Sequence, residues 1–181
     1  MDIRINNSIF NDYLKCTYKA YLKINGEVGE KSDYEIFQNN LLKEYKVSGI
    51  NFLKTKWMPD EIIDDISVNQ FINNDSKIGL NLSYTDDDFS VLFDGIEKIV
   101  GSGKKLVPVI FTIKENITIA EKLSLAFYGF VLGDRLNQKP SFGRVIHGAT
   151  YKNVRVNFDK LLLKLKPFVN DIQSYYTSKN R

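Results

Sequence analysis

The hydrophobic residues of the first fifty positions recur at the spacing of amphipathic helices. One helix is predicted over residues 8–26, with Asn7 or Ser8 as its cap and Gly26 as its end. A second helix is predicted over residues 32–54, where a serine and an aspartate precede the apolar positions. The chain therefore opens with helices.

From about residue 60 the pattern changes to short runs broken by turn residues. Residues 77–85 and 89–100 alternate on either side of the turn sequence TDDD. Residues 106–114, LVPVIFTIK, form an apolar run that ends at a charged residue. We expect an antiparallel meander, in which the sequence GSGKK makes the next tight turn.

The last third of the chain predicts a helix, a hairpin and a further helix. Residues 118–136 are apolar around most of the helical circumference, which is typical of a helix packed on a sheet. Segments 144–150 and 152–158 alternate as a hairpin, and residues 159–178 are amphipathic. The pattern predicts one α/β domain over residues 1–181, with a mixed β-sheet flanked by α-helices.

Composition and charge exclude some classes of protein. The chain is 43% hydrophobic and 26% charged, and no apolar run approaches the ~20 residues of a membrane span. The first residues lack the basic and apolar stretches of a secretory signal, and one cysteine makes no disulfide framework. We expect a cytoplasmic protein with no membrane partner. The net charge of +3 permits an anionic partner without requiring one.

Two stretches resemble a nuclease family. FNDYLKCTYKAYLKINGE, residues 10–27, resembles the opening of RecB-like nucleases of the PD-(D/E)XK superfamily, related to the iron–sulfur exonucleases of CRISPR adaptation. Residues 93–148 resemble a RecB-like core, in which an acid strand, a proline-valine strand, a long helix and a glycine-basic strand follow one another. The resemblance implies a restriction-endonuclease-like fold and a role in antiviral defence or DNA processing.

The resemblance also implies a metal site, which the chain supplies in part. Glu44, near the apolar face of the second predicted helix, and Asp94 stand where the family has catalytic acids, and Asp94 would bind the metal. The family's next strand supplies an acid and a lysine that serve Mg²⁺ chemistry. Here that strand offers Val109, Ile110 and Phe111, and valine cannot ligate a metal. We expect a degraded site, with Mg²⁺ or Mn²⁺ bound only if another group replaces the missing acid.

Other interpretations of these residues stay open. Lys114 and Glu115 follow the strand and could reach back if it is bulged. Asp94 precedes Gly95, as a turn aspartate would. Glu44 could equally be a surface acid among lysines.

Basic and aromatic residues are the candidates for binding nucleic acid. Lys15, Lys19 and Lys23 recur every fourth residue and would share one helix face, either for phosphates or simply solvated. Tyr128 matches a family tyrosine that holds the substrate strand, although Ser124 replaces the glutamine that precedes it in the family. The other candidates for phosphate or base contacts are Arg144, Arg155, Lys104, Lys105, Lys139, Lys152, Tyr18 and Tyr151.

Two single residues complete the list. Iron–sulfur members of the family use a cysteine at the position of Cys16 together with three more, because a cluster needs four thiolates. None follows here, so we expect no cluster unless a partner or a longer chain completes it, and Cys16 is expected as a small buried side chain. His147 has no accompanying nucleophile elbow or paired zinc ligand, so no catalytic role is predicted for it.

Three functions follow from these observations. The first is a nucleic-acid-binding accessory protein with a degraded nuclease site, whose partners are DNA and a protein subunit. The second is an active Mg²⁺-dependent nuclease that uses a displaced acid. The third is a scaffold that holds a partner protein without binding nucleic acid. The sequence does not decide whether the chain is an enzyme, or whether DNA or RNA is bound.

Overall fold

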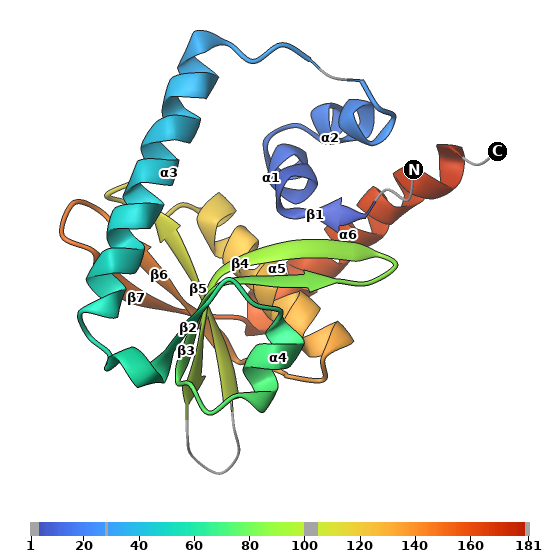
Figure 1. Cartoon of the computed structure of the whole chain (residues 1–181). Helices are drawn as coiled ribbons and strands as arrows, with labels where there is room; N and C mark the ends of the chain where they lie inside the picture. The colour runs from blue at the N-terminus through green and yellow to red at the C-terminus, as the bar shows by residue number, and fades with distance from the viewer. Residues whose placement is uncertain (1–3, 28, 100–104, 180–181) are drawn as a thin grey trace.

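A mixed β-sheet forms the centre of the protein. The computed structural model describes residues 4–27, 29–99 and 105–179 (Figure 1). In this part of the chain seven strands form one sheet in the order β2-β3-β4-β5-β6-β7, with β1 paired to β4. The predicted α/β class, a mixed sheet flanked by helices, is confirmed.

The strands are β1 (Ile5–Asn6), β2 (Ile62–Asp64), β3 (Ile78–Thr85), β4 (Phe89–Ile99), β5 (Lys105–Thr112), β6 (Phe142–His147) and β7 (Lys152–Asn157). The helices are α1 (Asn7–Lys15), α2 (Thr17–Ile24), α3 (Asp33–Lys54), α4 (Val68–Asn73), α5 (Ile119–Arg135) and α6 (Asp159–Lys179), with a 3-10 turn, η1, over Pro59–Glu61.

The strand directions match the predicted meander and hairpin. β3, β4 and β5 are antiparallel neighbours, and β6 and β7 form an antiparallel hairpin. β5 and β6 are parallel, which requires a crossover, and α5 supplies it. The expected turn GSGKK lies almost entirely outside the described residues.

Helices cover both faces of the sheet (Figure 1). α5 and α6 lie on one face and contribute Phe127, Val131 and Leu165 to the larger hydrophobic cluster. α3 lies on the other face, where a smaller cluster joins Tyr45 and Leu53 to strand residues. No helix in the described ranges has both the length and the apolar character needed to cross a membrane.

Only the second half of α3 packs on the sheet. Its buried residues are Tyr45, Gly49 and Leu53, and none of residues 33–44 is buried. Gly49 allows the close approach, because a Cβ at this position would lie 2.6 Å from Cδ1 of Phe111. The contact between helix and β5 therefore fixes which α3 side chains reach the sheet.

The helix predicted over residues 8–26 is two helices. Cys16 has an extended backbone, with φ −160° and ψ 113°, and separates α1 from α2. The cap of α1 is Asn6, whose side-chain oxygen accepts from the backbone N–H of Ile9 at 2.9 Å, and not Asn7 or Ser8. The helical spacing of apolar residues continues from α1 into α2, because α2 begins directly after Cys16. The sequence pattern therefore did not reveal the break. Cys16 is exposed, so the expectation of a buried cysteine was wrong.

Candidate functional site

The candidate site begins where β4 separates from β5. The ladder between the two strands ends at the pair Gly95 and Val109. Beyond it, the backbone of Leu92 pairs with the side-chain amide of Asn7, which donates to the Leu92 carbonyl at 2.8 Å and accepts from its N–H at 2.9 Å. The hydroxyl of Tyr128 donates to the same carbonyl at 2.8 Å. Asn7 thus continues the pairing that β1 begins and keeps β4 away from β5.

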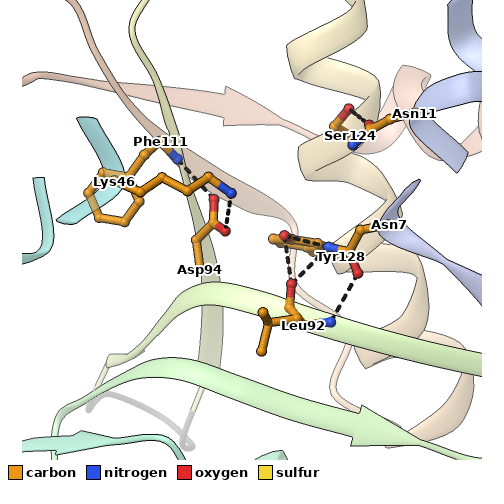
Figure 2. Close-up of polar contacts among 8 residues, drawn as sticks. All are labelled: Asn7, Asn11, Lys46, Leu92, Asp94, Phe111, Ser124 and Tyr128. Carbon is orange, nitrogen blue, oxygen red and sulfur yellow. Dashed lines mark hydrogen bonds and ion pairs between the residues drawn. The ribbon is translucent and has the colours of Figure 1, made fainter. Parts of the chain in front are cut away.

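Asp94 lies at this opening, and both of its carboxylate oxygens are engaged (Figure 2). Oδ2 accepts from the backbone N–H of Phe111 at 3.2 Å, a donor that the ended ladder leaves without a strand partner. Oδ1 accepts from Nζ of Lys46 at 2.7 Å. Asp94 is 8% exposed and lies inside β4, so the interpretation as a turn aspartate was wrong.

α3 delivers a cation to this site and not the expected acid. Lys46 points from α3 to Asp94, three residues before the contact between Gly49 and Phe111. Glu44 is exposed, and two residues of helix turn it about 200° away from Lys46. The expectation that Glu44 lies near the apolar face was wrong, because Tyr45 and Gly49 form that face.

The two residues considered as replacements make other contacts. Lys114 pairs with Glu121 on α5. The carboxylate of Glu115 accepts from the backbone N–H of Ala149 at 2.9 Å and lies 3.5 Å from Lys152 Nζ. Neither residue supplies the missing acid or lysine beside Asp94.

The residues at Asp94 do not fit a divalent-metal site. Mg²⁺ is held by several oxygen ligands, whereas Asp94 offers one carboxylate that already accepts from an ammonium and an amide. Throughout the described ranges, no group of three or more His, Cys, Asp or Glu side chains could hold a metal ion. The arrangement is that of an ion pair that joins α3 to the sheet.

Tyr128 is buried and cannot stack on a base, so that part of the prediction was wrong. It is 5% exposed, and its hydroxyl lies between Asn7 and Leu92 (Figure 2). Burial, followed by the charge of Asp94, raises its pKa well above the ordinary value. Ser124, in the position of the family's glutamine, donates to Oδ1 of Asn11 at 2.8 Å and ties α5 to α1.

The three lysines of the first predicted helix are divided between α1 and α2, because the chain breaks at Cys16. Lys19 pairs with Glu35 at 2.8 Å, and Lys23 pairs with Asp12 at 2.7 Å. Lys15 is exposed. Two of the three predicted phosphate ligands are therefore partly neutralised by acids of their own chain.

Arg144 and Arg155 lie directly opposite each other on the hairpin. Opposed residues of an antiparallel pair project from the same face of a sheet. Nε of Arg144 lies 2.8 Å from Oε2 of Glu97 on β4, and the guanidinium of Arg155 lies 3.8 Å from the ring centroid of Phe142. The structure thus places these two predicted ligands together.

Arg144 also lines an open cleft of about 550 Å³ beside the C-terminal end of α3. We call it the basic cleft, because its walls carry four cationic side chains and one carboxylate. Its lining residues are Leu53, Lys56, Trp57, Lys77, Glu97, Lys98, Ile99, Arg144 and Asn153. Apart from Arg144, the sequence-based list of binding residues missed this cleft. Two adjacent charged residues near the end of strand β4, Glu97 and Lys98, were the available signal.

Glu97 is the only acid among these lining residues. Burial raises its pKa, while the nearby charges of Arg144 and Lys56 act in the opposite direction. Lys98 is already committed, since its ammonium donates to the carbonyls of Phe71 and Asn74. Lys77 pairs with Glu61 and Arg144 with Glu97, whereas Lys56 has no carboxylate within ion-pair distance among the described residues.

The chain matches no protein-family model and no curated protein. Its likeness to RecB-like nucleases therefore remains a resemblance of sequence pattern, within an α/β fold that the structure bears out.

The remaining candidates are not among the lining residues of the basic cleft. Tyr18 is 64% exposed on α2, whereas Tyr151 stacks on Phe52 with ring centroids 4.8 Å apart. Lys105, Lys139 and Lys152 are exposed, and Lys104 lies outside the described residues. His147 is buried, and its Nδ1 has no hydrogen-bond partner among the residues that the structure describes.

Proposed function

We propose that this protein binds nucleic acid as a cytoplasmic accessory subunit of a defence or DNA-processing assembly, on a RecB-like nuclease fold that no longer cleaves. The observation that carries the proposal is the basic cleft, together with Arg155, which lies opposite Arg144 on the adjoining strand. We take DNA as the first partner to test.

Cationic side chains without a carboxylate partner support the proposal of nucleic-acid binding. Neither Lys56 nor Arg155 has a carboxylate within ion-pair distance among the described residues, so each is available to a backbone phosphate. Cationic grooves with an aromatic wall are how proteins hold single-stranded nucleic acid without reading its sequence. Trp57 supplies the aromatic wall here.

The proposed loss of cleavage rests on the small number of possible metal ligands at Asp94. A single carboxylate that accepts from Lys46 cannot hold the ion that polarises a phosphate and activates water. With Mg²⁺ or Mn²⁺, labelled single- and double-stranded DNA should stay intact. Cleavage that Asp94→Ala abolishes would establish the alternative, an active nuclease.

The binding proposal is tested by fluorescence anisotropy with labelled single-stranded DNA, duplex DNA and RNA over a series of salt concentrations. Lys56→Ala and Arg155→Ala should each weaken binding and flatten the slope of log K against log salt by roughly 0.7–0.9. Lys164→Ala, which removes an exposed lysine of α6, is the matched control and should leave the slope unchanged. No salt-dependent binding to any of the three probes would overturn the proposal.

A second candidate function, holding a partner protein, is favoured by α3. Its first half contributes no buried residue and presents Tyr34 and Phe37 with 70% and 57% of their surface exposed. A second copy of the chain is the simplest partner to test. Concentration-dependent dimerisation in sedimentation velocity, lost in Phe37→Ser, would support this function, and a monomer at all concentrations would count against self-association.

A further inference from the structure

We infer that the basic cleft holds one nucleotide unit of an unpaired nucleic-acid strand, with the base against Trp57 and the phosphate between Lys56 and Arg144. The inference rests on the proposed function and specifies which part of the ligand is recognised. It places recognition at the Ile99 end of β4, away from the Asp94 site.

The wall of the cleft is suited to a base. Trp57 is partly buried against the hydrophobic cluster under α3 and still lines the cleft, together with Leu53 and Ile99. An indole held by packing offers a fixed face, and every base has a flat face that can stack on it. Asn153 lines the same cleft and carries an amide that can both donate to and accept from a base edge.

The charges are suited to one phosphate. Nε of Arg144 lies 2.8 Å from Oε2 of Glu97, an ion pair without hydrogen-bond geometry, and the terminal Nη groups are the part of the guanidinium that this ion pair does not use. Those groups can donate side by side to two phosphate oxygens. Lys56 lines the same cleft, and its charge acts on Glu97, the carboxylate beside Arg144.

The other two cations contribute less to the ligand. Lys77 pairs with Glu61, and Lys98 is held by two carbonyls and lies 4.2 Å from the ring centroid of Phe71. Their charges add to the positive potential of the cleft, although neither is assigned to the phosphate. Arg144, beside Glu97, and Lys56, whose Nζ lies 4.3 Å from the ring centroid of Phe52, are therefore the two cations that we assign to a single phosphate group.

The size of the cleft selects an unpaired nucleotide. About 550 Å³ lies in the range of small-molecule sites and suits a nucleotide, whereas a duplex is too wide to enter. A base inside a duplex could reach Trp57 only by leaving its stack, which costs energy. We therefore expect single-stranded DNA to bind more tightly than a duplex of equal length.

The experiment uses Trp57, the single tryptophan of the chain, as a direct reporter of the cleft. Intrinsic fluorescence is measured while the full-length protein is titrated with adenosine monophosphate, a deoxyadenylate trinucleotide, adenosine or inorganic phosphate. The trinucleotide should quench strongly and the mononucleotide more weakly, and added salt should weaken both. Adenosine and phosphate alone should have little effect.

Four outcomes decide the matter. Quenching in the expected order supports the inference. If inorganic phosphate displaces the trinucleotide as effectively as the mononucleotide does, the cleft is a general anion site and the proposed role of the base is wrong. A duplex that quenches as strongly as a single strand would overturn the preference for an unpaired nucleotide. If anisotropy shows salt-dependent DNA binding while Trp57 fluorescence does not change, the inference fails and the proposed function stands.

Variants separate the base from the phosphate. Trp57→Leu should weaken single-strand binding in anisotropy by roughly tenfold, the order expected for one stacked base, and leave the salt slope unchanged. The double variant Arg144→Gln with Glu97→Gln removes the cation without leaving a buried unpaired carboxylate, and it should flatten the slope. Far-ultraviolet circular dichroism confirms folding of each variant, and unchanged affinity in folded Trp57→Leu would overturn the inference.

Discussion

Nζ of Lys46 on α3 lies 2.7 Å from Oδ1 of Asp94 on β4. This ion pair lies where the ladder between β4 and β5 ends. The resemblance to RecB-like nucleases places a divalent cation at this aspartate. An ammonium fixed to the protein neutralises the carboxylate here instead. We interpret the site as a structural connection between α3 and the sheet.

The first prediction is that Lys46 and Asp94 stabilise the fold as a pair. Asp94 has little access to water, so Lys46→Met leaves a buried carboxylate with one remaining donor and should cost about 1–3 kcal/mol of the free energy of unfolding. Asp94→Asn keeps an acceptor for the Phe111 N–H and removes the charge. The double variant should be less destabilised than the sum of the single variants.

Urea unfolding of the four proteins measures the coupling between the two side chains. Additive single effects would mean that the ion pair does not contribute, because coupled neighbours are expected to deviate from additivity. Glu44→Ala, on the same helix and exposed, is the control and should change stability by less than about 0.5 kcal/mol.

Local signals predicted most of the sheet and its helices. In the first half of β4, Phe89, Val91 and Phe93 alternate with less buried residues and belong to the larger hydrophobic cluster, which is the pattern of a strand with one face toward a core. The start of α5 also has a local cause, because the carboxylate of Glu121 accepts from the backbone N–H of Thr118 at 2.9 Å in a capping box. These features depend on neighbours within a few residues, which a single sequence displays.

The candidate sites depend on contacts that are distant in sequence. Lys46 and Asp94 are paired because Gly49 lets α3 approach Phe111, which sets the rotation of the helix. Helical periodicity alone suggested Glu44 as the inward residue. The basic cleft likewise forms only when the chain after α3, β4 and β6 come together, so its tryptophan and Lys56 had no local signature.

The second prediction concerns pH and Glu97. Its pKa is raised by burial, so on acidification Glu97 takes up a proton above the ordinary pH range of a glutamate, near 4.5. The groups that face it, Arg144, Lys56, Lys77 and Lys98, keep their charges throughout this range. Protonation removes the one negative charge of the cleft and releases Arg144 for phosphate. Binding of oligothymidylate should therefore tighten as the pH is lowered from neutrality into the range in which Glu97 takes up its proton.

Anisotropy at constant ionic strength measures this dependence, and oligothymidylate is chosen because its bases and internal phosphates do not titrate in this range. The Glu97→Gln variant should bind oligothymidylate tightly over the whole pH series, and its affinity should not depend on pH. A pH profile unchanged by Glu97→Gln would contradict this prediction and assign the effect to a group other than Glu97.

The third prediction concerns Cys16. Because its side chain is exposed at the break between α1 and α2, it should react with Ellman's reagent in the native protein, at one equivalent per chain. Protein purified without oxygen should be colourless and free of stoichiometric iron, because one thiolate cannot hold a cluster. A brown protein whose colour is lost in Cys16→Ser would mean that a partner chain completes the cluster.

The fourth prediction separates a structural from a binding role for the lysines of α1 and α2. Asp12 is 9% exposed and pairs with Lys23 at 2.7 Å, so Lys23→Ala leaves a largely buried carboxylate and should lower stability by about 1 kcal/mol. Lys15 has no carboxylate within ion-pair distance among the described residues, and Lys15→Ala should leave stability unchanged. Urea unfolding measures both.

Neither substitution should alter the salt dependence of nucleic-acid binding if the basic cleft is the site of contact, since these lysines are not among its lining residues. A phosphate contact at Lys15 would instead flatten the slope by roughly 0.7–0.9 in a protein that is fully folded. That result would extend the binding surface to α1. Loss of stability in Lys23→Ala with an unchanged slope would assign Lys23 to folding, because its charge is then used within the chain to compensate Asp12.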